Sequence, residues 1–217
     1  MRALVLDTSS AAITAGVVRV DATEVTLLAE QVTVNGKAHG ELLAPSIQAA
    51  LEQANLTPAD LDAVVAGTGP GPFTGLRVGL VTAAALADAR GLPTYGVCSL
   101  DGIGINHPDV ESLLVATDAR RKEIYWAAYR YGTRLLGPSV AKPAELPTDL
   151  VVETAIGAGA EQYQDVLALP VLHDPYPSVL GLARLAAERV RGRAVSEQLV
   201  PLYLRRPDAV PPKSMHS

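Results

Sequence analysis

The chain has 217 residues, of which 48% are apolar and 19% charged, and its net charge at neutral pH is −5. This length suits one large or two small globular domains, and the negative charge argues against a general nucleic-acid surface. Cys98 is the only cysteine, which excludes an internal disulfide. No uncharged apolar stretch is long enough to span a membrane, and a basic-then-apolar leader is absent, so we expect a cytoplasmic protein.

The N-terminal part of the chain predicts an antiparallel meander. Three runs rich in β-branched residues are joined by short turns, at residues 3–6, 12–20 and 25–34. Asp7, Thr8 and Ser9 end the first run. A strand that ends in an aspartate and hydroxyl groups could hold a phosphate or a metal–phosphate group. A polar turn that caps the strand explains the same residues more simply.

Residues 39–54 predict the first long helix, because apolar side chains recur there at intervals of three and four. Leu43 and Ile47 share one face, and Leu51 lies beside it. His39 stands at the start of this helix. As a metal ligand it would need a partner, but Leu43 occupies the position one turn later. We therefore expect a helix-terminal histidine and not a ligand.

The central stretch, residues 63–90, predicts a strand, a tight loop and a second long helix. Residues 63–66 form a short apolar run, and residues 67–72 are rich in glycine and proline, which makes a stiff turn. A loop of this kind could place backbone N–H groups around an anion at the helix N-terminus.

Small residues recur every four positions along the second helix, at Gly75, Gly79, Ala83 and Ala87. Glycine inside a helix costs about 1 kcal/mol relative to alanine, so we expect another backbone to approach this face closely. The pattern leaves open whether that backbone belongs to the chain's own sheet or to a second subunit.

After a strand at residues 94–97, a second unit is predicted to begin near Ser99. Residues 113–118 and 123–130 predict two strands that flank the charged turn Arg120-Arg121-Lys122, and aromatic residues concentrate there. A basic turn beside aromatic side chains could bind nucleic acid, but a solvated hairpin tip explains it at lower cost.

The remaining segments complete a mixed α/β pattern. Residues 151–156 predict a strand that ends in a second glycine turn, and residues 179–191 predict an amphipathic helix. Residues 199–204 fit a late strand or a docked segment, and residues 208–217 a disordered tail. One glycine turn in each unit is compatible with a duplicated two-domain fold.

Four segments closely resemble the TsaB family, also called YeaZ, whose members assist threonylcarbamoyladenosine formation in bacterial tRNA. They are residues 4–9, 39–45, 69–79 and 201–205. The resemblance implies an α/β, actin-like/Hsp70-like/sugar-kinase-like ATPase fold with two duplicated, ribonuclease H-like lobes. The implied parts are an N-terminal lobe at 1–98, a shortened C-terminal lobe at 99–206 and a disordered tail at 207–217.

The resemblance also implies a non-catalytic role. The related catalytic subunit, TsaD, carries an HxxxH metal motif just after the strand that corresponds to residues 94–97. Ser99 and Ile103 stand at the two histidine positions in this chain. Isoleucine cannot bind a metal, and one hydroxyl is a poor substitute for imidazole. We therefore expect neither a metal site nor a catalytic residue.

The expected role is a partner subunit, required with TsaD and TsaE for threonylcarbamoyl transfer to adenosine 37 of tRNAs that read ANN codons. TsaD is the expected heterodimer partner, and the chain alone is expected to form a homodimer. Contact with tRNA is expected to be indirect, through the complex. The resemblance places the interface on the two long helices, with these contact residues: His39, Leu43, Ile47, Leu51, Gly75, Gly79, Ala83 and Ala87.

Two other functions compete with this one. A small-molecule phosphotransferase would bind ATP and Mg²⁺ through Asp7, Thr8 and Ser9, with Asp118 as a carboxylate base. In a partner subunit, ATP or ADP with Mg²⁺ would instead bind at an interface of the complex. A metal-dependent peptidase is disfavoured because the HxxxH motif is missing.

Overall fold

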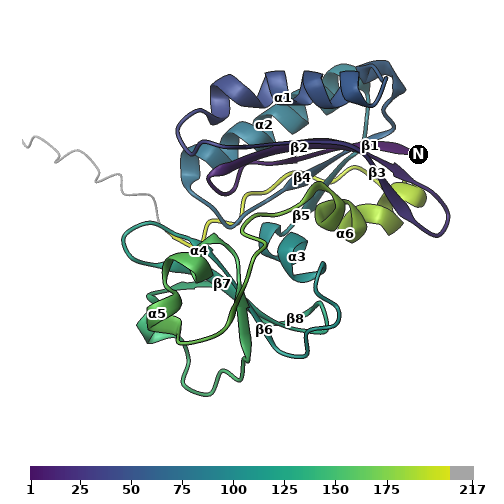
Figure 1. Ribbon diagram of the computed structural model, residues 1–217. Helices are drawn as coiled ribbons and strands as arrows, with labels where there is room; N and C mark the ends of the chain where they lie inside the picture. The colour runs from purple at the N-terminus through teal and green to yellow at the C-terminus, as the bar shows by residue number, and fades with distance from the viewer. Residues whose placement is uncertain (206–217) are drawn as a thin grey trace, which may run out of the picture.

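The computed structural model describes residues 1–205 and shows two lobes, each built on a five-stranded sheet (Figure 1). The predicted tail at residues 207–217 lies outside the described residues. Over residues 1–205, no helix combines the length and the apolar character that a membrane crossing requires.

The first lobe contains a mixed sheet in the order β3-β2-β1-β4-β5. Its strands are β1 (Arg2–Asp7), β2 (Ala12–Val20), β3 (Val25–Val34), β4 (Ala63–Gly67) and β5 (Thr94–Val97). The first three form the predicted antiparallel meander, β4 pairs with β1 in parallel, and β5 pairs with β4 in parallel at the sheet edge. The prediction of a mixed sheet is confirmed.

Three long helices cover the two faces of this sheet (Figure 1). α1 (His39–Gln53) and α2 (Phe73–Arg90) lie on one face, and α6 (Val179–Arg191) lies on the other. Successive strand residues point to opposite faces. Leu4 therefore packs in the cluster under α1 and α2, whereas Val5 packs under α6. Each such fully buried side chain stabilises the fold by roughly 1.5–3 kcal/mol.

The position of α6 corrects the lobe boundary expected from the sequence. Residues 99–206 were assigned to the second lobe, but α6 shares its apolar cluster with β1, β4 and β5 of the first sheet. An amphipathic helix must bury its apolar stripe, and the uncovered face of the first sheet accepts it. The second lobe therefore ends before α6.

The second lobe repeats the topology of the first, in the order β8-β7-β6-β9-β10. Its strands are β6 (Leu113–Asp118), β7 (Ile124–Arg130), β8 (Thr133–Ala141), β9 (Thr154–Ile156) and β10 (Val171–Leu172). β6, β7 and β8 are antiparallel, β9 pairs with β6 in parallel, and β10 pairs with β9 in parallel at the sheet edge. The expectation of duplicated lobes agrees with this repeat.

Short helices complete the chain. They are α3 (Ser99–Gly104), α4 (Ala158–Gln162), α5 (Gln164–Leu167) and the single 3₁₀ turns η1 (Pro58–Asp60) and η2 (Pro143–Glu145). The sequence predictions missed α3, β8 and β10 and started β9 at residue 151. Residues 199–204 form no strand; they are the docked segment that the sequence allowed.

Candidate functional site at the lobe junction

The residues that end β1 form a closed polar turn. Asp7, Thr8 and Ser9 are buried, and Asp7 exposes only 1% of its surface. Asp7 Oδ1 accepts hydrogen bonds from Ser9 N at 2.9 Å and from Ser9 Oγ at 2.8 Å. Asp7 Oδ2 accepts one from Ser99 Oγ at 2.5 Å. Groups of the chain itself thus occupy both carboxylate oxygens.

Burial is the largest influence on Asp7 and raises the pKa of its carboxyl above the ordinary value, because the charged form loses its hydration. Hydrogen bonds from Ser99 and Ser9 and the nearby His39 act in the opposite direction. His39 Nε2 lies 2.8 Å from the carbonyl oxygen of Ser10. The histidine at the start of α1 therefore contacts the backbone of this turn.

Thr8 explains the glycines of α2. Its Oγ1 donates to the carbonyl oxygen of Gly75 at 2.7 Å and accepts from the backbone N–H of Gly79 at 2.9 Å. A Cβ atom at position 79 would clash with this hydroxyl, and one at position 75 would lie 3.0 Å from the Thr8 carbonyl oxygen. The close approach predicted from the spacing is present: the Thr8 backbone approaches Gly75, and the Thr8 side chain approaches Gly79, from the chain's own turn after β1.

All eight residues predicted to contact a partner are buried by the chain itself. Leu43, Ile47, Leu51, Ala83 and Ala87 belong to one cluster between the first sheet and its two helices. His39, Gly75 and Gly79 surround the end of β1. The small-residue face therefore packs within the chain itself, and the prediction that these side chains line a subunit interface stays a prediction. Helical spacing identifies a buried stripe but does not say what buries it.

The two positions that match the metal motif of the catalytic subunit lie one turn apart on α3. Ser99 donates its hydroxyl to Asp7, and its backbone N–H donates to the carbonyl oxygen of Gly69 at 2.8 Å. Ile103 is fully buried in the apolar cluster of the second lobe. Among residues 1–205, no group of three or more histidine, cysteine, aspartate or glutamate side chains could hold a metal ion.

This turn, as arranged, does not fit a nucleotide phosphate or its Mg²⁺. Oxygen ligands of Mg²⁺ must face open space, but both oxygens of Asp7 and the hydroxyl of Thr8 are engaged within the protein. The backbone N–H of Gly69, in the glycine-rich loop, donates to Ser99 Oγ at 3.1 Å. The phosphotransferase alternative therefore gains no support from these residues.

The corresponding turn of the second lobe, after β6, is open and basic. Arg120, Arg121 and Lys122 all have positive φ angles, of 62°, 55° and 62°. A left-handed conformation costs a residue other than glycine roughly 1–2 kcal/mol. Asp118, the predicted base, accepts from Arg120 N at 2.9 Å and pairs with its guanidinium at 3.7 Å. The carboxylate therefore shapes the turn.

A hollow of about 260 Å³ lies beside this turn, between the lobes. Phe73 and Tyr203 line it, and their rings stack with centroids 5.0 Å apart. The guanidinium of Arg77 lies 3.7 Å from the centre of the Phe73 ring, and Arg77 Nε donates to the Tyr203 hydroxyl at 2.7 Å. Sequence reasoning missed this cluster, because Tyr203 is far from the other two residues along the chain.

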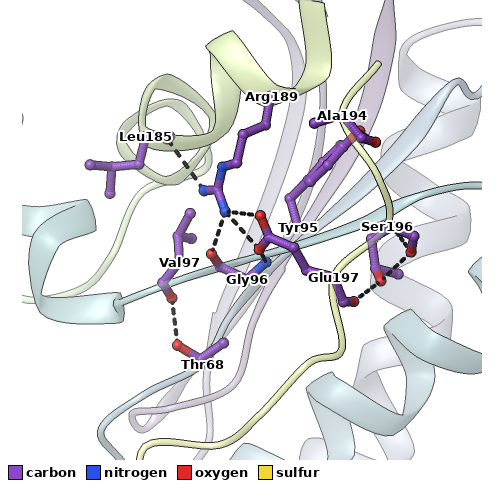
Figure 2. A network of polar contacts seen from close by, with 10 residues as sticks. Thr68, Tyr95, Gly96, Val97, Leu185, Arg189, Ala194, Ser196 and Glu197 are labelled. Atoms are coloured by element: carbon purple, nitrogen blue, oxygen red, sulfur yellow. Dashed lines mark hydrogen bonds and ion pairs between the residues drawn. The ribbon is translucent and has the colours of Figure 1, made fainter. Parts of the chain in front are cut away.

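The segment after α6, residues 194–205, crosses the edge strand β5 (Figure 2). Arg189 of α6 pairs with Glu197 at 2.8 Å and also donates to the Gly96 carbonyl oxygen at 3.1 Å. The backbone N–H of Glu197 donates to the Thr94 carbonyl oxygen at 2.8 Å. The Tyr95 hydroxyl donates to the Ala194 carbonyl oxygen. This segment covers the sheet edge and carries Tyr203 to the hollow.

The outer surface of α1 and α2 exposes small and apolar side chains. Val81 on α2 is 66% exposed, and Ala84 and Ala85 follow it at helical spacing. Ala44 and Pro45 are the corresponding exposed residues of α1. We call these five exposed residues, Ala44, Pro45, Val81, Ala84 and Ala85, the outer face of the two helices.

Comparison with known proteins identifies the family. A family model described as TsaD, tRNA N6-adenosine threonylcarbamoyltransferase, matches residues 26–203. An uncharacterised protein of Mycobacterium tuberculosis is 49% identical over 208 residues, which are 96% of this chain and 93% of that protein. A Mycobacterium leprae relative is also 49% identical, and the chain spans 56% of its length.

Named relatives agree with the predicted resemblance. The tRNA threonylcarbamoyladenosine biosynthesis protein TsaB of Bacillus subtilis is 32% identical over 137 residues, covering 63% of this chain and 58% of that protein. The solved structure of YeaZ from Pseudomonas aeruginosa superposes with a TM-score of 0.76 at 25% identity, over 94% of this chain and 99% of that one. These matches confirm the resemblance and the predicted fold class.

Proposed function

The chain belongs to the TsaD family of tRNA N6-adenosine threonylcarbamoyltransferases, and we propose that it takes part in threonylcarbamoyladenosine formation on tRNA. We propose that its part in this process is that of a non-catalytic subunit. The observation that carries the proposal is the environment of Ser99 and Ile103. The resemblance places the metal histidines of the catalytic subunit at these positions. Here one is a hydroxyl bonded to Asp7 and the other an aliphatic side chain in the core.

The proposed partners are a TsaD-type catalytic subunit and TsaE, acting in the cytoplasm on adenosine 37 of tRNAs that read ANN codons. Homologues named for tRNA threonylcarbamoyladenosine biosynthesis support the process to which the chain is assigned. We propose that any ATP or ADP with Mg²⁺ in the assembly binds at a subunit interface; in support, the polar groups of the Asp7 turn are bonded to the chain itself.

Reconstitution tests this proposal. TsaD, TsaE, the threonylcarbamoyl-adenylate synthase and tRNA are combined with and without this chain, and modified adenosine is quantified. We expect modification only when the chain is present, and none when the chain alone meets tRNA, threonylcarbamoyl-adenylate and divalent metals. Turnover by the chain alone would contradict a non-catalytic role, and equal modification without the chain would contradict a required one.

We further propose that the outer face of α1 and α2 is the surface that pairs with the catalytic subunit, and with a second copy when the chain is alone. Small side chains allow two helix layers to approach closely and gain dispersion contacts. Val81→Arg is expected to weaken both associations at least tenfold while the melting temperature is kept. Val151→Arg is the matched control, because Val151 is 81% exposed on the second lobe. Equal effects of the two variants would contradict this surface.

A further inference from the structure

The exposed side chain of Arg77 carries a positive charge that no carboxylate neutralises within residues 1–205. Its Nε donates to the Tyr203 hydroxyl at 2.7 Å. In the same part of the chain, its two terminal NH₂ groups donate to no protein acceptor. The outer end of Arg77 therefore presents forked N–H donors of a cation, which match the two oxygens of a carboxylate.

Two aromatic rings hold this guanidinium in one position. It lies 3.7 Å from the centre of the Phe73 ring and 5.8 Å from the centre of the Tyr203 ring. Ring faces attract a cation at these distances, and the two rings also stack on each other. We call Phe73, Arg77 and Tyr203 the aromatic–arginine cluster. Because its arginine is ordered before any partner arrives, binding costs it less side-chain entropy.

The position of Arg77 on α2 connects the cluster to the outer face of the two helices. Val81 of that face follows four residues later and is 66% exposed. Residues four apart are neighbours on one side of a helix. Arginine and aromatic side chains are enriched among the residues that contribute most to protein–protein binding. The cluster therefore continues the outer face towards the start of α2.

The charges beside the cluster suit one anionic group and not a polyanion. Three arginines line the adjoining hollow, and each has a partner. Arg205 pairs with Glu123, Arg120 pairs with Asp118, and Arg121 is also engaged. A nucleic-acid backbone is bound by neutralising several phosphates at once, whereas a single unneutralised guanidinium is satisfied by one carboxylate. The local chemistry thus favours a protein side chain as the ligand.

We propose that Arg77 forms an ion pair with a carboxylate of the catalytic subunit, beside the outer face at the start of α2, and that Tyr203 positions it. The inference rests on the proposed function, because it specifies one contact of the proposed pairing. It also gives a role to the segment after α6, which brings the Tyr203 hydroxyl to the Arg77 side chain.

Isothermal titration calorimetry of the full chain against the catalytic subunit tests the ion pair. Arg77→Glu should weaken association at least tenfold, because the new carboxylate repels that of the partner. Arg90→Glu is the matched control and should bind like the parent. Arg90 is exposed in the last turn of the same helix, has no carboxylate partner among the described residues, and changes the net charge equally. Both variants should keep the melting temperature of the parent.

Ionic strength gives a second measurement of the same contact. Salt screens an exposed ion pair, so the affinity of the parent should fall as the salt concentration rises. Arg77→Ala should start from a weaker affinity and respond less to salt, because it lacks the charge. This variant also keeps the test valid if Arg77→Glu disturbs the start of α2.

A double-mutant cycle tests the positioning role of Tyr203. Tyr203→Phe keeps the ring and removes only the hydroxyl that accepts from Arg77. It should weaken association about threefold, as for the loss of one hydrogen bond. In the Arg77→Ala background the same change should have no further effect, because it acts through Arg77. A purely structural role would instead weaken association equally in both backgrounds.

The inference is overturned if Arg77→Glu and Arg77→Ala bind the catalytic subunit like the parent, if Arg90→Glu weakens association as much as Arg77→Glu, or if parent and Arg77→Ala respond equally to salt. It is also overturned if Arg77→Glu weakens only the binding of tRNA, since the cation would then serve RNA.

Reconstituted modification, measured in parallel, distinguishes the failure of this inference from that of the proposed function. A parent chain that binds the catalytic subunit and supports modification, while the Arg77 variants bind equally well, removes only this inference. A parent chain that neither binds the catalytic subunit nor supports modification removes the proposed function, and the inference with it.

Discussion

Each lobe begins with a strand that ends in an aspartate, Asp7 in the first lobe and Asp118 in the second. The two sheets repeat one strand order, so the two turns occupy equivalent places. Asp7 is enclosed by hydrogen bonds from its own turn and from Ser99, whereas the side chain of Asp118 is 31% exposed and pairs with Arg120. The turn after β1 is part of the core, and the turn after β6 lies at the surface.

The helix that follows the fourth strand also differs between the two lobes. In the first lobe that helix is α2, with 18 residues, and the hydroxyl of Thr8 reaches into its first turns. In the second lobe the equivalent helix, α4, has 5 residues. Equivalent turns of a duplicated fold can therefore differ in the contacts that their neighbouring elements make.

The largest expected effect on stability comes from placing a large side chain against Thr8, in the turn after β1. Gly79→Leu should lower the free energy of unfolding by about 3 kcal/mol or more, because the side chain would enter the space of Thr8. Urea denaturation measures the loss, with Ala84→Leu on the exposed side of α2 as the control, expected within about 0.5 kcal/mol. A stable Gly79→Leu variant that fails to bind the catalytic subunit would show that the small-residue face of α2 contacts that subunit.

The next effect removes a single donor from the closed turn. Ser99→Ala should cost about 1.5–3 kcal/mol of stability, because it removes the hydrogen bond to the buried Asp7 carboxylate and the acceptor of the Gly69 N–H. In the open turn, Asp118→Asn should cost less than about 1 kcal/mol, since the exposed pair with Arg120 is worth little. Thermal unfolding distinguishes the two, and equal costs would contradict the contrast between the turns.

The contribution of Asp7 to stability should depend on pH. The pKa of Asp7 is raised in the folded protein by burial, so its protonated form stabilises the fold below the unfolded pKa of about 3.9. That contribution is lost as the pH rises through the folded pKa. Asp7→Asn should therefore gain stability relative to the parent as the pH rises from acid to neutral. Denaturation at several pH values checks this sign, and a relative loss at neutral pH would refute it.

The smallest effect concerns strain in the open turn. Lys122→Gly should leave stability unchanged or raise it by about 0.5 kcal/mol, because glycine adopts the left-handed conformation without the penalty of a side chain. Arg193→Gly, at another positive φ angle outside both turns, is the control. Destabilisation by more than about 1 kcal/mol, measured by urea denaturation, would show that the Lys122 side chain holds the turn.

Much of this fold could be predicted from sequence because its signals are local. The meander, α1, α2 and α6 all follow from hydrophobic periodicity and from glycine and proline at their ends. β10 has only two residues and β8 is largely exposed, so neither carries an apolar run that marks it. The identity of the element that buries a stripe, as for Gly79 under Thr8, is tertiary information.

One of the candidate sites could be predicted from the sequence and the other could not. Asp7, Thr8 and Ser9 were singled out as a polar turn, and the simpler interpretation, a turn that caps the strand, agrees with their burial. The meeting of Phe73, Arg77 and Tyr203 could not be predicted, because the segment after α6 reaches them only by crossing the first lobe. No spacing rule connects residues so distant along the chain.

The central claim is that the first turn is a structural part of a non-catalytic subunit, and one measurement tests it most directly. Modified adenosine is quantified in the reconstituted reaction without the chain, with the parent chain and with Asp7→Asn. We predict no product without the chain and equal rates with parent and variant, because both carboxylate oxygens of Asp7 accept hydrogen bonds from groups of its own chain. Loss of product with a folded Asp7→Asn variant that still binds the catalytic subunit would contradict the account.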